Sequence, residues 1–343
     1  MRQIRLGNTG LKVSEYCLGT MSFGSSAWKS WVLDEAQSRP LLRQAVEAGI
    51  TFYDMANWYS LGVNEEAVTR ALLELVPRDQ LVLATKVYYP MSDAPNDKGL
   101  SRKHILRSVD ASLRRMKTDY IDLLVIHAFD PDVPIEETMG ALHDLVRAGK
   151  VLYLGASTMF AWQFATMNHV AEMNGWTPFV NMQCQYNLLY REEEREMIPY
   201  CRANGIAVTG FSPLARGWLT GAKGQRATED RYVAEFYGDE TDLALVEAVR
   251  DIAARRGVSM TEVALAWVRQ MQAITCPIIG ISKASHLDQA LSALDLALDP
   301  EERQLLDRLY CPREPISDQV IPRWQRRQDT ALPPLNPKGT TGS

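Results

Sequence analysis

Residues 121–157 read IDLLVIHAFDPDVPIEETMGALHDLVRAGKVLYLGAS and contain a complete strand–helix–strand repeat. The apolar runs Ile121–His127 and Val151–Ser157 are typical of buried strands. Between them, Pro134–Ala148 has helical periodicity, begins at a proline and ends before Gly149, which is the expected polarity of helix start and stop signals. The stretch therefore predicts two strands joined by a helix, the unit from which α/β folds are built.

The same alternation extends along most of the chain. The strand-like runs are Tyr16–Met21, Thr51–Asp54, Leu81–Lys86, Ile121–His127, Val151–Ser157, Val180–Tyr186, Ala207–Ser212 and Ile274–Gly280. The segments with helical patterns are Asp34–Ala48, Asn64–Leu75, Ser101–Arg115, Pro134–Ala148, Ala161–Asn174, Glu192–Asn204, Leu243–Arg256 and His286–Leu294, with Thr261–Gln270 and Pro300–Leu309 as extra helices. Eight strand–helix units predict a (β/α)8 TIM barrel.

A doubly wound open sheet is the competing fold, and it would need a glycine-rich turn after the first strand to bind a dinucleotide. The first run ends Gly19-Thr20-Met21-Ser22-Phe23-Gly24-Ser25, which has no G-x-G-x-x-G pattern, so the barrel is favoured. Before this run, residues 4–13 are typical of a β-hairpin, which we expect to close the bottom of the barrel.

Composition limits the class of protein. The chain has 343 residues, 46% hydrophobic and 23% charged, with a net charge of −5, which excludes a wholly disordered chain and gives no basic excess for nucleic acid or a membrane surface. No apolar run approaches the ~20 residues of a membrane span. The five cysteines are scattered without a Cys-x-x-Cys pair, which indicates neither a metal site nor disulfides. We expect a cytoplasmic protein.

Length alone predicts about two domains, but a barrel reduces this number to one. We predict a single domain over residues 1–311 and a proline-rich C-terminal tail over residues 312–343. The polar segment Gly217–Glu240 is longer than an ordinary connection, so it is either functional or mobile. Its residues Arg231, Tyr232, Phe236 and Tyr237 and the tail residue Trp324 are candidates to close over the site.

Proton-handling residues follow three consecutive strands. Asp54 ends the second run and Tyr59 follows it, Lys86 ends the third, and His127 ends the fourth. Each has an ordinary structural interpretation, such as a helix cap, a packing residue or a solvated lysine. In a barrel, however, the carboxyl ends of the strands converge on one active site, so the arrangement predicts a catalytic cluster.

These residues lie in motifs that resemble the aldo-keto reductase superfamily. Residues 49–59, GITFYDMANWY, are close to the family pattern G-x-x-x-[FL]-D-T-A-x-x-Y and depart from it at Tyr53 and Met55. Residues 149–157, GKVLYLGAS, match G-K-x-x-x-[IL]-G-x-S, and residues 211–221, FSPLARGWLTG, resemble the cofactor motif of the seventh strand. The resemblance covers roughly residues 2–310 and is strongest to the bacterial and fungal branch. It implies an NADP-dependent oxidoreductase that reduces carbonyls.

The resemblance implies a role for each catalytic residue, and the chemistry agrees. Tyr59 would be the general acid/base, Lys86 and Asp54 would tune it, and His127 would bind the carbonyl. A phenol has a pKa of about 10, and a neighbouring ammonium lowers it. Asp54 would pair with Lys86 and prevent an uncompensated buried cation, while His127 would donate a hydrogen bond to the substrate oxygen.

The family binds NADP(H) in an extended form without a Rossmann motif. The resemblance implies that Ser157 and Gln183 bind the carboxamide and that Tyr186 stacks beneath the nicotinamide. The remaining cofactor residues that it implies are Gly19, Thr20, Met21, Ser212, Pro213, Leu214, Arg216, Gly217, Gly280, Ser282, Lys283, His286 and Gln289. Lys283 is the candidate for the 2′-phosphate. The chain departs from the family at Thr158, where Asn is usual, and at His286 and Ala290.

Aromatic residues follow the same strands. Trp28, Trp31, Trp58, Tyr88 and Phe129 predict a substrate pocket that encloses an apolar or ring-bearing carbonyl, although several of them could instead pack loops onto the barrel. Two other functions stay open: a cofactor-binding regulatory subunit with little turnover, and a barrel enzyme without redox chemistry. The predicted partner is a small-molecule carbonyl substrate, and the sequence does not indicate an oligomeric state.

Overall fold

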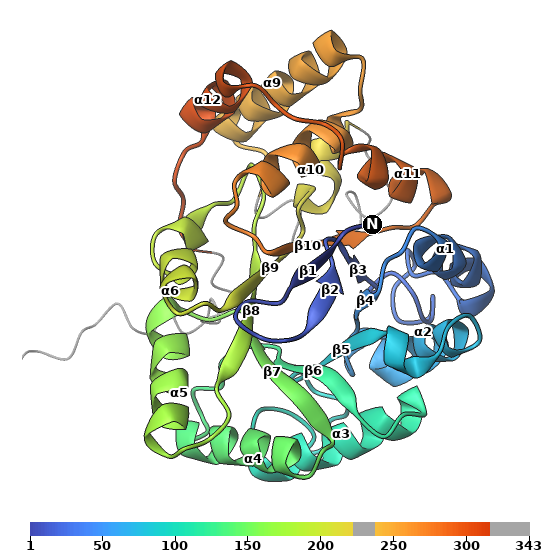
Figure 1. Cartoon of the computed structure of the whole chain (residues 1–343), viewed down its shortest axis with the longest axis vertical. Coiled ribbons are helices and arrows are strands. Elements are labelled where there is room, and N and C mark those ends of the chain that lie inside the picture. Colours follow the sequence, from blue (N-terminus) through green and yellow to red (C-terminus); the bar gives the residue numbers. More distant parts are fainter. Residues whose placement is uncertain (222–236, 316–343) are drawn as a thin grey trace, which may run out of the picture.

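The computed structural model describes residues 1–221 and 237–315, and their central element is a closed barrel of eight parallel strands. In order around the barrel the strands are β10, β3, β4, β5, β6, β7, β8 and β9, so the last strand pairs with the first and closes the cylinder (Figure 1). Their bounds are β3 Cys17–Gly19, β4 Phe52–Asp54, β5 Val82–Val87, β6 Ile121–Ile126, β7 Val151–Ser157, β8 Phe179–Gln185, β9 Ala207–Phe211 and β10 Cys276–Gly280. The predicted (β/α)8 barrel is confirmed.

Helices surround the barrel as predicted, including the two extra ones. Their bounds are α1 Glu35–Glu47, α2 Val63–Leu73, α3 Arg102–Met116, α4 Ile135–Arg147, α5 Ala161–Met173, α6 Met197–Ala203, α9 Glu240–Arg256, α10 Met260–Gln270, α11 Ala284–Ser292 and α12 Pro300–Leu309. Side chains cap several starts: Ser101 accepts a hydrogen bond from the backbone of His104, and Ser259 forms a capping box with Glu262. No helix of the described residues is long and apolar enough to cross a membrane.

One helix differs from its prediction. The segment Glu192–Asn204 divides into a short 3-10 turn, Glu192–Glu194, and α6. The Glu192 carboxylate accepts hydrogen bonds from the Tyr310 hydroxyl and from the Arg313 backbone, both beyond α12. Both partners are more than 100 residues away in the sequence, so the helical pattern of residues 192–204 could not predict these hydrogen bonds.

Alternation along the strands separates two cores. Residues two apart in a strand face the same side, and the inward rows form an apolar cluster that includes Phe52, Val82, Ala84 and Leu123. A larger cluster lies between the barrel wall and the helices. Toward the carboxyl ends of the strands, the inward rows continue from Phe52 to Asp54 and from Ala84 to Lys86. The alternation therefore directs both charged side chains into the carboxyl-terminal opening of the barrel, which we call the barrel mouth.

The predicted hairpin is present at the opposite end. Strands β1 Gln3–Arg5 and β2 Lys12–Ser14 pair antiparallel, and Figure 1 shows them lying across the barrel opening. Leu6 and Val13 are fully buried in the inner cluster. The hairpin therefore closes the amino-terminal end of the barrel.

Two predicted surface segments are only partly described. Residues 222–236 of the predicted loop 217–240, including Arg231, Tyr232 and Phe236, lie outside the described residues. So do residues 316–343 of the predicted tail, including Trp324.

Candidate active site

The predicted catalytic residues meet at the carboxyl end of β4, β5 and β6. The Lys86 ammonium is fully buried and donates to Asp54 Oδ2 at 2.6 Å, to the Met55 backbone oxygen at 2.9 Å and to the Tyr59 hydroxyl at 3.1 Å. All three donors of the ammonium are thus used. Burial alone would lower the pKa of Lys86, but the nearby Asp54 and Tyr59 outweigh it and raise the pKa above its ordinary value. Lys86 is therefore held as a cation.

A strained turn holds Tyr59 above Lys86. Tyr59 begins a 3-10 turn, Tyr59–Gly62, in which Ser60 and Leu61 both have φ of 50°. Gly62 ends this turn at φ 97°, a conformation that other residues rarely adopt, so the position favours glycine. Arg115 pairs at 2.6 Å with the buried Glu65 of α2. Positive φ at two non-glycine residues persists only where surrounding contacts impose it, which is common at functional sites.

His127 directly follows β6 and contacts Tyr59. The two rings lie 5.8 Å apart in an edge-to-face arrangement. Burial, together with the positive charge of Lys86, lowers the pKa of His127 well below its usual range, so the imidazole is neutral. Its Nδ1 is buried and has no hydrogen-bond partner among the described residues. A neutral imidazole can donate one hydrogen bond, which is the role that the resemblance implies.

Aromatic side chains surround this cluster. Trp28 lies 6.4 Å from Tyr59 and 5.1 Å from Trp58, and Trp58 lies 4.8 Å from Tyr89. The ring of Tyr89 lies 4.8 Å from the ring of His127. The predicted pocket residues Trp28 and Trp58 are therefore brought close to Tyr59.

The other predicted pocket residues lie further out. Trp31 packs edge-on against Trp28. Tyr88 contacts the ring of Tyr89, and it packs against the outer core. Tyr89, which the sequence places beside it, is the residue that contacts His127. Phe129 lies beyond His127 and pairs with Trp162, a residue that the pocket prediction omitted.

Two predicted carboxamide ligands lie beside the catalytic cluster. Gln183 faces inward and donates from Nε2 to Asp54 Oδ1 at 3.0 Å, which leaves its Oε1 for an external donor. Ser157 ends β7, and its hydroxyl lies 2.9 Å from that of Thr158. Thr158 has φ of 52°, an unusual conformation for a β-branched residue. The Gln183 contact joins this region to the ion pair of Asp54 and Lys86.

The structure corrects the prediction for Tyr186. This residue is fully buried, its ring stacks on Trp267 at 5.6 Å, and its hydroxyl donates to Glu194. The reason is the alternation of the strand: Gln183 and Gln185 face inward, so Tyr186 faces the helices. It offers no ring face to a cofactor. The half-buried Phe211, at the end of β9, packs against the inner cluster instead.

The structure also corrects the prediction for Thr20. Its side chain is fully buried, donates to the Asp54 backbone oxygen at 2.8 Å and accepts from Asn64. The Thr20 hydroxyl therefore links the end of β3 to β4 by a hydrogen bond and is not available to a ligand. Its neighbours Gly19 and Met21 are half-buried.

The predicted pyrophosphate segment has an unusual backbone. Ser212, Ala215, Arg216 and Gly217 all have positive φ, between 47° and 107°. Turns of this kind direct successive backbone N–H groups to one side and form anion-binding concavities called nests. Pro213 is buried, while Leu214 and Arg216 are half-buried. The segment is anchored by Asn187, which donates to the Ser212 backbone oxygen at 3.0 Å.

The predicted phosphate residues gather at the start of α11. Gly280, Ser282 and Lys283 are exposed, and Lys283 is the residue before the first turn of the helix. His286 accepts from the Ser282 backbone at 3.3 Å, and burial and Lys283 lower the pKa of His286. Gln289 lies one turn further and is half-buried. A helix start with an adjacent lysine favours an anion.

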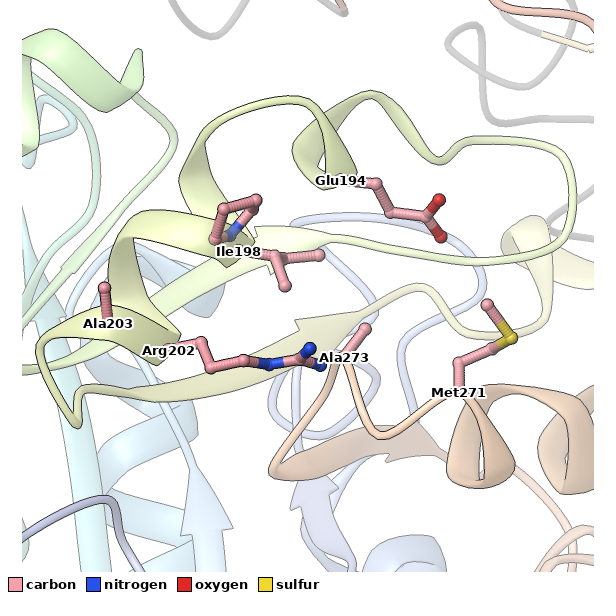
Figure 2. A pocket seen from close by; sticks show the side chains of 7 residues that line it. Glu194, Ile198, Arg202, Ala203, Met271 and Ala273 are labelled. Atoms are coloured by element: carbon pink, nitrogen blue, oxygen red, sulfur yellow. The ribbon is translucent and has the colours of Figure 1, made fainter.

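A separate pocket of about 440 Å³ lies on the outside of the barrel, between α6 and the segment after α10 (Figure 2). Ile198, Arg202, Met271 and Ala273 are among its lining residues. Its one carboxylate, Glu194, already accepts from Tyr186 and Arg191. None of the predicted site residues lines this pocket, so the candidate active site remains the barrel mouth.

Comparison with known proteins agrees with the motifs. The model of the Aldo/keto reductase family matches residues 15–310. Aldo-keto reductase AFTS1 of Alternaria alternata is 44% identical over 334 residues, covering 89% of this chain and 91% of the relative. Versiconal hemiacetal acetate reductase of Aspergillus parasiticus is 41% identical over 338 residues, covering 91% of this chain and 98% of the relative.

Proposed function

The chain belongs to the aldo/keto reductase family, and on that premise we propose that it is an NADPH-dependent reductase that converts aldehyde and ketone carbonyls reversibly to alcohols. The family reduces carbonyls and generally uses nicotinamide cofactors. The observation that carries the proposal is the buried Lys86 ammonium, hydrogen-bonded to both Asp54 and the Tyr59 hydroxyl beside His127.

Tyr59 is the proposed proton donor to the carbonyl oxygen. Giving up that proton leaves a phenolate, and Lys86 stabilises it across 3.1 Å. Asp54 keeps Lys86 charged, because its carboxylate helps to raise the pKa of the ammonium. In the reverse direction the same phenolate accepts the alcohol proton.

His127 orients the substrate in this proposal. Its neutral imidazole donates one hydrogen bond to the carbonyl oxygen, next to the Tyr59 hydroxyl. The lowered pKa keeps His127 from competing with Tyr59 as a proton donor at neutral pH. The two rings thus bind one oxygen from two sides.

The residues of the opposite rim fit NADPH. When bound, this cofactor supplies the hydride that the carbonyl carbon accepts. Ser157 and Gln183 would hold its carboxamide, Phe211 would pack against its ring in place of Tyr186, and the nest of residues 212–217 would bind the pyrophosphate. Lys283, at the start of α11, would bind the 2′-phosphate and favour NADPH over NADH.

The test has two steps. The intact protein is titrated with NADPH while its tryptophan fluorescence is measured, and it is then assayed with NADPH against a panel of aldehydes and ketones. We expect saturable quenching, turnover of some aldehydes, and a loss of kcat of roughly 10²–10⁴ in Tyr59→Phe without loss of NADPH binding. Tyr153→Phe, a half-buried tyrosine of β7, is the control and should keep its activity.

Two outcomes would overturn the proposal. Binding of NADPH without turnover across the panel, in a protein indistinguishable from Tyr59→Phe, would favour a cofactor-binding regulatory subunit. Absence of any NADPH binding would favour a barrel enzyme without redox chemistry.

A further inference from the structure

Trp162 is an exposed tryptophan at the substrate face of the barrel. Its side chain is 61% exposed, although tryptophan is one of the residues most often covered in folded proteins. It is the second residue of α5, which begins just after β7 ends at Ser157. Because each helix of the barrel begins at the carboxyl ends of the strands, Trp162 lies on the rim that carries the catalytic residues.

Phe129 connects Trp162 to the catalytic cluster. The two rings lie 6.3 Å apart and are tilted by 59°. Phe129 is half-buried against the outer core, so its position is fixed by packing. It follows His127 by two residues, which span at most about 7 Å. The pair therefore continues the site outward from the residue that orients the carbonyl.

The aromatic residues of the rim form two groups on either side of His127. Trp28, Trp58 and Tyr89 come from the connections after β3, β4 and β5, and they surround Tyr59. Phe129 comes from the connection after β6, and Trp162 from the first turn of α5, which follows β7. The first group is close enough to enclose the reacting end of a substrate, whereas the second lies further out and leaves an indole in solvent.

We propose that Phe129 and Trp162 form a distal subsite that binds the second ring of an extended aromatic aldehyde, whose carbonyl lies at Tyr59 and His127. This inference rests on the proposed carbonyl reduction and names its substrate class. A substrate with two rings in line would place its second ring beyond His127, where Phe129 follows two residues later in the chain. Stacking on Trp162 covers the exposed indole, which is the favourable change that selects the longer substrate.

The experiment compares benzaldehyde with 4-phenylbenzaldehyde as substrates of the full chain with NADPH. The wild-type protein should have the higher kcat/KM for 4-phenylbenzaldehyde. Trp162→Ala should lower the ratio of the two kcat/KM values about tenfold, mainly through KM for the longer substrate. Trp162→Phe keeps an aromatic ring and should restore much of the ratio.

The matched control is Met173→Ala. Met173 ends the same helix and is 73% exposed, but it lies at the end of α5 away from the mouth, so its removal should leave the ratio unchanged. Equal ratios in the wild type and Trp162→Ala, or a wild type that reduces benzaldehyde but not 4-phenylbenzaldehyde, would overturn the distal subsite alone. A wild type that reduces neither aldehyde, nor any other of the panel, would overturn the proposed function instead.

Discussion

The two halves of the barrel mouth are built in different ways. At the ends of β4 and β5, side chains satisfy one another: Lys86 is bonded to Asp54 and Tyr59 and is fully buried. At the start of α11, by contrast, Gly280, Ser282 and Lys283 are exposed, and the 212–217 segment presents backbone at positive φ. The first half is ordered by its own ion pair, whereas the second combines exposed residues at the start of α11 with a loop whose backbone has positive φ.

Under the proposed function, this difference separates the chemistry from cofactor binding. A catalytic cluster needs distances fixed before the substrate arrives, and mutual hydrogen bonds between buried charges provide them. A site for a long anionic cofactor needs many donors spread over several loops, and backbone nests and surface cations provide those. Mutations in the first half should therefore affect stability and kcat, and mutations in the second should affect cofactor affinity.

Lys86→Met should have the largest effect. It leaves the Asp54 carboxylate buried without its cation, which should cost about 3–5 kcal/mol of unfolding free energy, and it removes the group that stabilises the Tyr59 phenolate. We expect kcat to fall by roughly 10²–10⁴. Urea unfolding and steady-state kinetics measure the two effects.

The control for this variant is Lys150→Met. Lys150 pairs with Asp110 at 2.7 Å, but both side chains are about two-fifths exposed, at 42% and 43%. Its loss should cost less than about 1 kcal/mol. Equal stability of the two variants would contradict the contrast between a buried and an exposed ion pair.

Lys283→Ala tests the second half. Removing this cation should raise KM for NADPH about tenfold and leave KM for NADH nearly unchanged, because only NADPH has the 2′-phosphate. Unfolding free energy should not change, since Lys283 is exposed. Lys12→Ala removes the same charge from β2 at the closed end and should change neither KM. An equal rise of KM for both cofactors would refute the assignment.

The pH dependence of stability tests the neutral state of His127. Its folded pKa is lowered, so the unfolded chain takes up the proton first as pH falls below about 6.5, and stability is lost from that point downward. Between pH 7.5 and 5.5, the wild type should lose roughly 1 kcal/mol more than His127→Gln. His169→Gln, at an exposed position of α5, should follow the wild type. Parallel curves for all three proteins would show that burial does not hold His127 neutral.

Thr158→Asn should have the smallest effect and an opposite sign. Asparagine tolerates positive φ better than a β-branched residue, so the change should raise the free energy of unfolding by about 0.5–1 kcal/mol. The loss of the hydroxyl contact with Ser157 reduces this gain. The new amide also adds a ligand for the carboxamide and should lower Kd for NADPH. Thr158→Ala removes the same hydroxyl contact without adding an amide and serves as the control. A less stable Asn variant would show that the hydroxyl contact matters more than the backbone.

The sequence predicted the parts of the site that strands position. Strand ends located Asp54, Lys86 and His127, and β7 has its predicted bounds. The role assigned to Tyr186 was wrong because this residue directly follows β8, three positions after Gln183, and lies in the outer core. Trp162 was missed because its exposure, rather than its residue type, is what distinguishes it. The predicted helix Glu192–Asn204 is divided at its start, where Glu192 accepts hydrogen bonds from Tyr310 and Arg313, partners that no local pattern connects to it.

The seam between β3 and β10 has a consequence for how the protein is made. Cys17 pairs with Ile278, and the Ser22 hydroxyl bonds to the Ile281 backbone oxygen across 259 positions of the chain. During synthesis, the strands of the catalytic half can pair as they leave the ribosome, but the cylinder cannot close until nearly all of the described chain exists. Gly19 and Gly280, which are partners at this seam, therefore come together last. A chain released before residue 276 is made would carry Asp54, Tyr59, Lys86 and His127 on an open sheet with two exposed edges, which favours aggregation.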